Sequence, residues 1–298
     1  MCKSCVTSAV TCWALLAAMI FAPAQASQGK EERLQLDFRG EAHYSEYNFT
    51  DVVQPYDAMD AWTELRIAYW LDDKQSLAPY LSVVPVSTSQ SSFWWQRNVQ
   101  TDFGVQWYPF SASSLRNIRL FAGSASRQYY DKPDNADAEG TDILVGGDYY
   151  YDNLYFDGFP TNERTLAILW TNLAYRKTNF SQDDYEALLW LGNIKVGPNV
   201  RHGRSMLLPY AVTDWAYVPK HGERWWENYL RVGAGIRWYP KTTRADGFPV
   251  GDLAKRSYVY AEVLRNVAWL GDHPTSSDIR QTDLRIGIGF STSGFLRQ

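Results

Sequence analysis

Long stretches of the chain alternate between apolar and polar residues. From Leu34 to Tyr44 the sequence LQLDFRGEAHY places apolar or small side chains on one face of an extended chain, and Gln, Asp, Arg, Glu and His on the other. The same alternation recurs at 229–240 and at 281–290. A period of two residues predicts β-strands. Strands of about ten residues exceed the ~5–6 usual in globular proteins and are long enough to cross a bilayer at a tilt.

The pattern predicts about twelve such strands, within a range of ten to sixteen, and single-chain membrane barrels have an even number. Turn-forming residues fill the intervening segments, as in DKPDNADAEG at 131–140 and FDGFPTNER at 156–164. No Pro/Gly-rich joint or block of charge divides the chain into two domains. The predicted strands cover 34–44, 61–71, 77–86, 97–108, 115–128, 142–151, 164–176, 185–196, 206–217, 228–239, 257–269 and 280–291.

Two all-β folds give this alternation, a soluble β-sandwich and a membrane barrel. Aromatic residues make up 15% of the chain, with 20 Tyr, 13 Trp and 13 Phe. After residue 26 no apolar run approaches the ~18 residues of a helical membrane span. Strand length, strand number and aromatic strand ends favour a transmembrane antiparallel β-barrel, whose polar face lines the interior while its apolar face contacts lipid.

The amino terminus has the three parts of a secretory signal peptide. Residues 1–26 contain a lysine near the start, a short apolar run and a closing Ala-Gln-Ala. The alternative, a membrane anchor, needs a longer run of ~20 residues. We expect cleavage after Ala26, which leaves 27–298 as an outer-membrane barrel of a Gram-negative cell. The three cysteines of the chain all lie in the leader: Cys2, Cys5 and Cys12.

An internal repeat relates 79–109 to 209–240. Each copy contains, in order, Pro-Tyr, Trp-Trp, Asn and Trp-Tyr-Pro. The repeat predicts a strand, a loop that opens onto a Trp pair, and a returning strand ended by proline. Tryptophans at strand ends suit an aromatic girdle at the membrane interface, or alternatively a platform that stacks on sugar rings. The girdle or glycan-stacking candidates are Trp94, Trp95, Trp107, Trp225, Trp226 and Trp238.

Two pairs of adjacent strands carry similar motifs. Gly104-Val-Gln-Trp-Tyr-Pro109 precedes Ile118-Arg-Leu-Phe-Ala-Gly123, and Gly235-Ile-Arg-Trp-Tyr-Pro240 precedes Tyr258-Val-Tyr-Ala-Glu262. These motifs resemble the carboxy-terminal barrels of exopolysaccharide secretion proteins, such as the phage-adsorption outer-membrane protein and the cellulose and poly-N-acetylglucosamine exporters. Those proteins carry long periplasmic helical repeats, whereas only 27–33 precede the first predicted strand here. The resemblance implies a glycan passage whose periplasmic scaffold or inner-membrane synthase is a separate partner.

Charged residues on the polar faces of the predicted strands are candidates for the barrel lumen. Their mixed signs allow two interpretations: ion pairs that plug a narrow barrel, or a hydrated track that binds a polar oligosaccharide weakly at many sites. About twelve strands lie between filled eight-stranded and open sixteen-stranded barrels, so strand number does not decide. The lumen and substrate-path candidates are Arg39, Glu41, Arg66, Asp102, Arg119, Arg231, Arg237, Glu262, Asp283 and Arg285.

Enzymatic chemistry has little support in the pattern. A lipid hydrolase needs Ser and His with an acidic or amide partner. His202 and Ser205 are three residues apart in a predicted loop, and His43 alternates with charged residues on a predicted lumen face. We find no metal-ligand cluster, phosphate-binding loop or nucleophile elbow, and therefore expect no catalytic residue, metal or cofactor.

These observations favour one function and leave two alternatives. We expect an outer-membrane barrel that acts as a channel or assembly factor for export of a cell-surface polysaccharide. The alternatives are an outer-membrane enzyme acting on lipid or lipid A, and a small-solute channel or structural barrel. Expected partners are outer-membrane lipid, the polysaccharide and its scaffold or synthase. A net charge of −4 argues against nucleic acid, whose phosphates need a basic surface.

Overall fold

The computed structural model describes most of the predicted barrel. The predicted signal peptide lies outside the described residues, and so do the Trp-Trp pairs at 94–95 and 225–226. The described residues are 33–47, 56–89, 97–110, 117–130, 141–152, 155–156, 159–160, 164–178, 185–202, 205–218, 228–240, 257–270 and 282–291.

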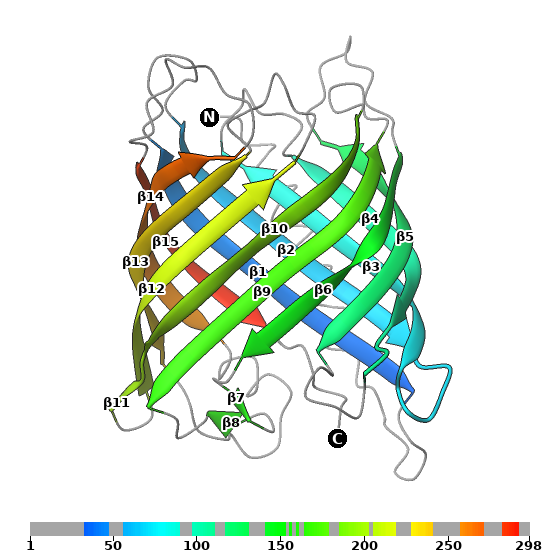
Figure 1. Ribbon diagram of the computed structural model, residues 1–298, viewed down its shortest axis with the longest axis horizontal. Helices are drawn as coiled ribbons and strands as arrows, with labels where there is room; N and C mark the ends of the chain where they lie inside the picture. The colour runs from blue at the N-terminus through cyan, green and yellow to red at the C-terminus, as the bar shows by residue number, and fades with distance from the viewer. Residues whose placement is uncertain are drawn as a thin grey trace. The chain divides into compact units, whose positions relative to one another are not determined.

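Twelve long antiparallel strands form one closed barrel, which confirms the predicted fold class and strand number (Figure 1). Each long strand pairs with the next one along the chain, and the last pairs with the first. The strands are β1 (Leu34–Tyr47), β2 (Tyr56–Tyr69), β3 (Leu77–Thr88), β4 (Asn98–Trp107), β5 (Ile118–Tyr129), β6 (Thr141–Asp152), β9 (Thr165–Thr178), β10 (Tyr185–Pro198), β12 (Ser205–Tyr217), β13 (Tyr229–Tyr239), β14 (Tyr258–Trp269) and β15 (Thr282–Ser291).

Three short strands are present in addition to the twelve long ones. The strands β7 (Tyr155–Phe156) and β8 (Phe159–Pro160) pair only with each other, in the connection between β6 and β9. The strand β11 (Val200–His202) continues the line of β10 and pairs with β12. Among the described residues no helix is long and apolar enough to cross a membrane.

The large exposed apolar side chains lie on the outer face and most charged side chains on the inner face, while an apolar cluster that includes Leu166, Met206 and Leu208 is also buried inside the barrel. Phe103 is 60% exposed, and Ile288 is 57% exposed. Gln35 and Gln106, in contrast, are buried inside the barrel. A contiguous belt of exposed apolar side chains is unfavourable in water but suits the hydrocarbon of a bilayer. The arrangement therefore identifies the outer face as the lipid-facing one and excludes the soluble sandwich.

Aromatic side chains mark the rim at which β1 begins and β15 ends. Tyr69, Trp107 and Trp238 each lie at the end of a strand and are about half exposed on the outer face. The amphipathic rings of Tyr and Trp are favoured at the level of the lipid headgroups. Their position is the one expected of an aromatic girdle.

The sequence repeat corresponds to half a turn of the barrel. Its first copy begins in β3 and its second in β12, and β12 is the sixth strand after β3 in the ring of twelve (β4, β5, β6, β9, β10, β12). In each copy the tyrosine lies opposite a glycine of the next strand: Tyr80 opposite Gly104, and Tyr210 opposite Gly235. A Cβ added at Gly235 would lie 2.6 Å from the Tyr210 hydroxyl, so the glycine provides the space in which the ring lies against the wall.

The Asp72 carboxylate stabilises the hairpin turn between β2 and β3 by accepting three hydrogen bonds. Asp72 accepts hydrogen bonds from the Ser76 hydroxyl at 2.5 Å, the Ser76 amide at 2.8 Å and the Leu77 amide at 3.0 Å. The bond from the Ser76 side chain lowers the pKa of Asp72, because it stabilises the charged form. Gln75 completes the turn with a φ of 52°, in the left-handed region.

The assignment of faces predicts how introduced charges affect stability. Ile236 and Ile286 both lie on the lipid-facing belt, so replacing either by Arg is expected to lower the free energy of unfolding by roughly 2–4 kcal/mol. Leu71→Arg is the control, because this exposed residue lies at the β2–β3 turn, where an arginine costs about 1 kcal/mol or less. Urea unfolding in lipid vesicles measures the three values; equal costs at rim and belt would contradict the assignment.

Candidate functional site

All ten predicted lumen residues face the barrel interior, where they divide into two sets. Arg39, Arg66, Asp102 and Arg119 line a cavity of about 300 Å³ against the wall formed by β1 to β6. The other six take part in polar contacts on the opposite side, from β10 to β1: Glu41, Arg231, Arg237, Glu262, Asp283 and Arg285. One barrel therefore contains both arrangements that the sequence left open, a lined cavity and a packed network of ion pairs.

Ion pairs hold two of the cavity arginines. The Nε of Arg39 lies 2.5 Å from a carboxylate oxygen of Glu64 on the adjacent strand. Arg119 pairs with Asp148 in the same way across β5 and β6. These guanidinium groups are thus neutralised by the protein, although both residues still line the cavity.

The cavity also presents hydrogen-bond acceptors and aromatic faces. The carboxylate of Asp102 accepts hydrogen bonds from Gln100 at 2.8 Å and from the Ser82 hydroxyl at 3.2 Å. Trp62 and Phe121 contribute rings to the lining. Charged, amide, hydroxyl and aromatic groups together form a polar recess with apolar platforms, a lining suited to a ligand that carries many hydroxyl groups.

Arg66 differs from its neighbours in the cavity. Its guanidinium carbon lies 4.0 Å from the centre of the Tyr80 ring, a close cation–π contact. Its buried Nε has no hydrogen-bond partner, and no carboxylate in the described part of the chain forms an ion pair with it. Arg66 therefore faces the cavity without an ion-pair partner among the described residues, although Asp37 lies opposite it in the register of β1 and β2.

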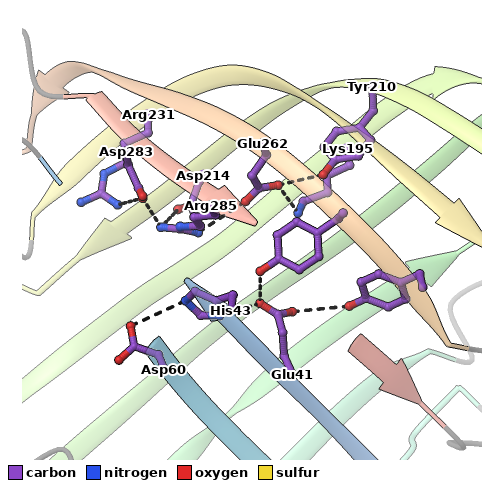
Figure 2. Close-up of polar contacts among 12 residues, drawn as sticks. Glu41, His43, Asp60, Lys195, Tyr210, Asp214, Arg231, Glu262, Asp283 and Arg285 are labelled. Atoms are coloured by element: carbon purple, nitrogen blue, oxygen red, sulfur yellow. Dashed lines mark hydrogen bonds and ion pairs between the residues drawn. The ribbon is translucent and has the colours of Figure 1, made fainter. Parts of the chain in front are cut away.

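Glu262 organises the opposite wall (Figure 2). Its carboxylate lies 2.7 Å from the Lys195 ammonium and accepts a 2.9 Å hydrogen bond from the Tyr210 hydroxyl. Arg285 approaches the other oxygen at 3.5 Å. Lys195, Tyr210 and Glu262 are all buried, so the strands β10, β12 and β14 are joined through an interior ion pair.

Further carboxylates extend this network, as Figure 2 also shows. Asp283 lies 3.2 Å from Arg231 and 2.6 Å from Arg285. Glu41 of β1 accepts a 2.5 Å hydrogen bond from the Tyr260 hydroxyl, and the Nδ1 of His43 lies 3.1 Å from the same carboxylate. We use the name closed wall for the following residues: Glu41, His43, Lys195, Tyr210, Arg231, Tyr260, Glu262, Asp283 and Arg285.

Some members of the site were missed in the sequence. Lys195 and Tyr210 are on predicted strands, and their faces follow from the alternation, but the predicted lumen residues do not include them. Asp142 is a third example, since it pairs with both Arg127 and Arg176. Comparing the two copies of the repeat would have pointed to Tyr210, because its counterpart Tyr80 lies in the cavity lining.

The remaining candidates lie away from the cavity. Trp107 and Trp238 face outward, so they cannot contact a ligand inside the barrel. His202 and Ser205 are cross-strand partners at the β11–β12 turn, where the Ser205 hydroxyl donates to the His202 carbonyl oxygen at 3.0 Å and not to the imidazole. Among the described residues, no group of His, Cys, Asp and Glu could hold a metal ion.

Comparison with known proteins gives similarity of fold only. No family model matches the chain, and no curated protein matches it. Solved structures with similar barrels include a bacterial polysaccharide outer membrane secretin at 8% identity, with 89% of this chain and 99% of that chain covered and a TM-score of 0.40. Outer membrane phospholipase A from Escherichia coli is 12% identical, over 84% and 92%, with a TM-score of 0.39. The KdgM porin is 11% identical, over 84% and 98%, with a TM-score of 0.33.

The closed wall predicts a specific cost for removing one of its cations. Arg285→Gln leaves Asp283 and Glu262 with fewer counter-charges in a buried environment, so we expect the free energy of unfolding to fall by about 3 kcal/mol or more. Lys74→Gln, which removes an exposed cation at the β2–β3 turn, is the control and should change stability by less than about 0.5 kcal/mol. Urea unfolding in vesicles compares the two. Equal, small effects would show that the ion pairs of the closed wall do not stabilise the barrel.

Proposed function

We propose that this protein is an outer-membrane barrel that binds a saccharide in its lumen and serves the passage of a cell-surface polysaccharide. The observation that carries the proposal is the cavity against β1 to β6, with its mixed lining of arginine, carboxylate, amide and aromatic side chains. Its volume of about 300 Å³ lies at the lower end of the ~300–1,000 Å³ typical of small-molecule sites.

The chemistry of sugars supports this choice over a simple salt channel. Each sugar hydroxyl both donates and accepts hydrogen bonds, so a saccharide site needs donors and acceptors side by side. The cavity has donors in Arg66 and acceptors in Asp102, and the ring of Trp62 offers an apolar face for the C–H side of a sugar. A passage needs binding that is favourable enough to admit the chain and weak enough to release it.

The closed wall supports a narrow passage. Its ion pairs occupy the inner face from β10 to β1, so in this proposal a chain in the lumen lies along the β1–β6 wall. In this proposal a separate periplasmic scaffold or inner-membrane synthase delivers the polysaccharide, as the resemblance to the exopolysaccharide barrels implies. The protein's own contribution is the wall that contacts the moving chain.

Conductance across planar bilayers tests the proposal. We expect a steady pore that is blocked by cellotriose or by its carboxylated counterpart, and a gene deletion that lowers surface polysaccharide. Trp62→Ala should weaken the block about tenfold through loss of the aromatic face, whereas the outward-facing Trp107→Ala should leave it unchanged. A pore that neither saccharide blocks, together with normal polysaccharide in the deletion strain, would contradict the proposal. An ester-hydrolysing activity lost in Ser205→Ala would favour a lipid enzyme instead.

A further inference from the structure

The strand before each copy of the repeat places a cation over the equivalent tyrosine. Beside the first copy, Arg66 of β2 lies opposite Ser82, two residues after Tyr80. Beside the second copy, Lys195 of β10 lies opposite Val212, two residues after Tyr210. Each cation contacts the ring of its tyrosine, at 4.0 Å for Arg66 and 5.2 Å for Lys195. Arg66 and Lys195 are thus equivalent positions in the two halves of the barrel.

The two halves differ in what neutralises this cation. The glycine opposite each tyrosine pairs in turn with a residue of the following strand: Gly104 with Gly123, and Gly235 with Glu262. Glu262 supplies the carboxylate that binds Lys195 and Tyr210. Gly123, its equivalent, has no side chain, and this is where the cavity lies, lined by Arg66, Tyr80 and Gly123.

We propose that the cavity binds the carboxylate of an acidic sugar, at the place that corresponds to the Glu262 carboxylate in the other half. The ligand carboxylate pairs with the Arg66 guanidinium, which can donate two parallel hydrogen bonds, and accepts a further one from the Tyr80 hydroxyl. This inference rests on the proposed function and names its substrate class, a chain that contains uronic acid residues.

The other charges of the cavity restrict the kind of anion that can bind beside Arg66. Arg39 and Arg119 are already paired with Glu64 and Asp148, so they add no net positive charge. Asp102, which accepts hydrogen bonds from Gln100 and Ser82, and Asp37, which lies opposite Arg66 in the register, are negative. Among the described lining residues Arg66 is the cation without an ion pair, and Asp102 can accept a hydrogen bond from a sugar hydroxyl. The two carboxylates repel a phosphate dianion more strongly than a single ligand carboxylate.

A pair of matched sugars tests the inference. Cellotriose and the β-1,4-linked glucuronic acid trimer share one backbone and differ in the group at C6, a neutral CH₂OH in the first and a carboxylate in the second. In planar bilayers at constant ionic strength, the acidic trimer should block the wild-type pore at a concentration about tenfold lower than cellotriose. Equal block by the two sugars would overturn the carboxylate site while leaving saccharide passage intact, whereas block by neither would contradict the proposed function itself.

Variants of Arg66 locate the site. Arg66→Gln should abolish the preference, so that the two trimers block at about the same concentration. Block by cellotriose should stay within about twofold of wild type. Arg66→Lys should retain part of the preference, because it keeps the charge but loses the paired hydrogen bonds and the planar contact with Tyr80. The outward-facing Arg265→Gln is the control for a general change in charge. Heat-modifiable migration on detergent gels establishes that each variant is folded. A folded Arg66→Gln barrel that still prefers the acidic trimer would overturn the assignment.

Discussion

Closure of the barrel is the constraint on which the other features depend. In a bilayer every backbone amide and carbonyl must be satisfied within the protein, and pairing of β15 with β1 removes the last open edges. The register of this seam runs from Arg39 opposite Ser291 to Tyr47 opposite Asp283. Once the sheet closes, alternate side chains must point either to lipid or to a confined interior. Charges on the inner face then meet one another across a narrow space, and each requires a counter-charge, water or a ligand.

The interior meets this requirement in two ways. On the closed wall Glu262 and Asp283, together with the neighbouring Asp214, pair with Lys195, Arg231 and Arg285, and the tyrosines that bridge the strands lie over glycines. On the other wall Gly123 stands where Glu262 stands in the second half, and a cavity takes the place of the ion pair. The two copies of the repeat, which begin six strands apart, thus differ: an ion pair lies beside the second copy, and a cavity lies beside the first. This asymmetry links the fold to the proposed function.

The sequence predicts the faces of the strands well because the direction of a side chain depends only on its parity. Asp102 and Arg285 were assigned to the lumen on this basis, and both lie there. Strand ends are less predictable: β2 begins at Tyr56, five residues before its predicted start, because pairing with Tyr47 of β1 extends it. The ion-pair partners could not be predicted. Lys195 and Glu262 are 67 residues apart in the sequence and lie on β10 and β14, which are separated by β12 and β13. Their contact depends on the register of these strands and on the space left by inward-facing glycines, neither of which the alternation predicts. The Trp-Trp pairs and the signal peptide lie outside the described residues, so those expectations stay predictions.

The difference between the two walls can be measured directly, because residues 27–298 contain no cysteine. Val84 lines the cavity, and Val212 is a buried, inward-facing valine packed beside the closed wall. A single cysteine is introduced by Val84→Cys or by Val212→Cys, and the folded barrel is treated with a water-soluble, charged methanethiosulfonate reagent. The account predicts rapid modification at position 84, slowed by a bound saccharide, and modification at position 212 only after unfolding. Equal reactivity at the two positions in the folded barrel would contradict it.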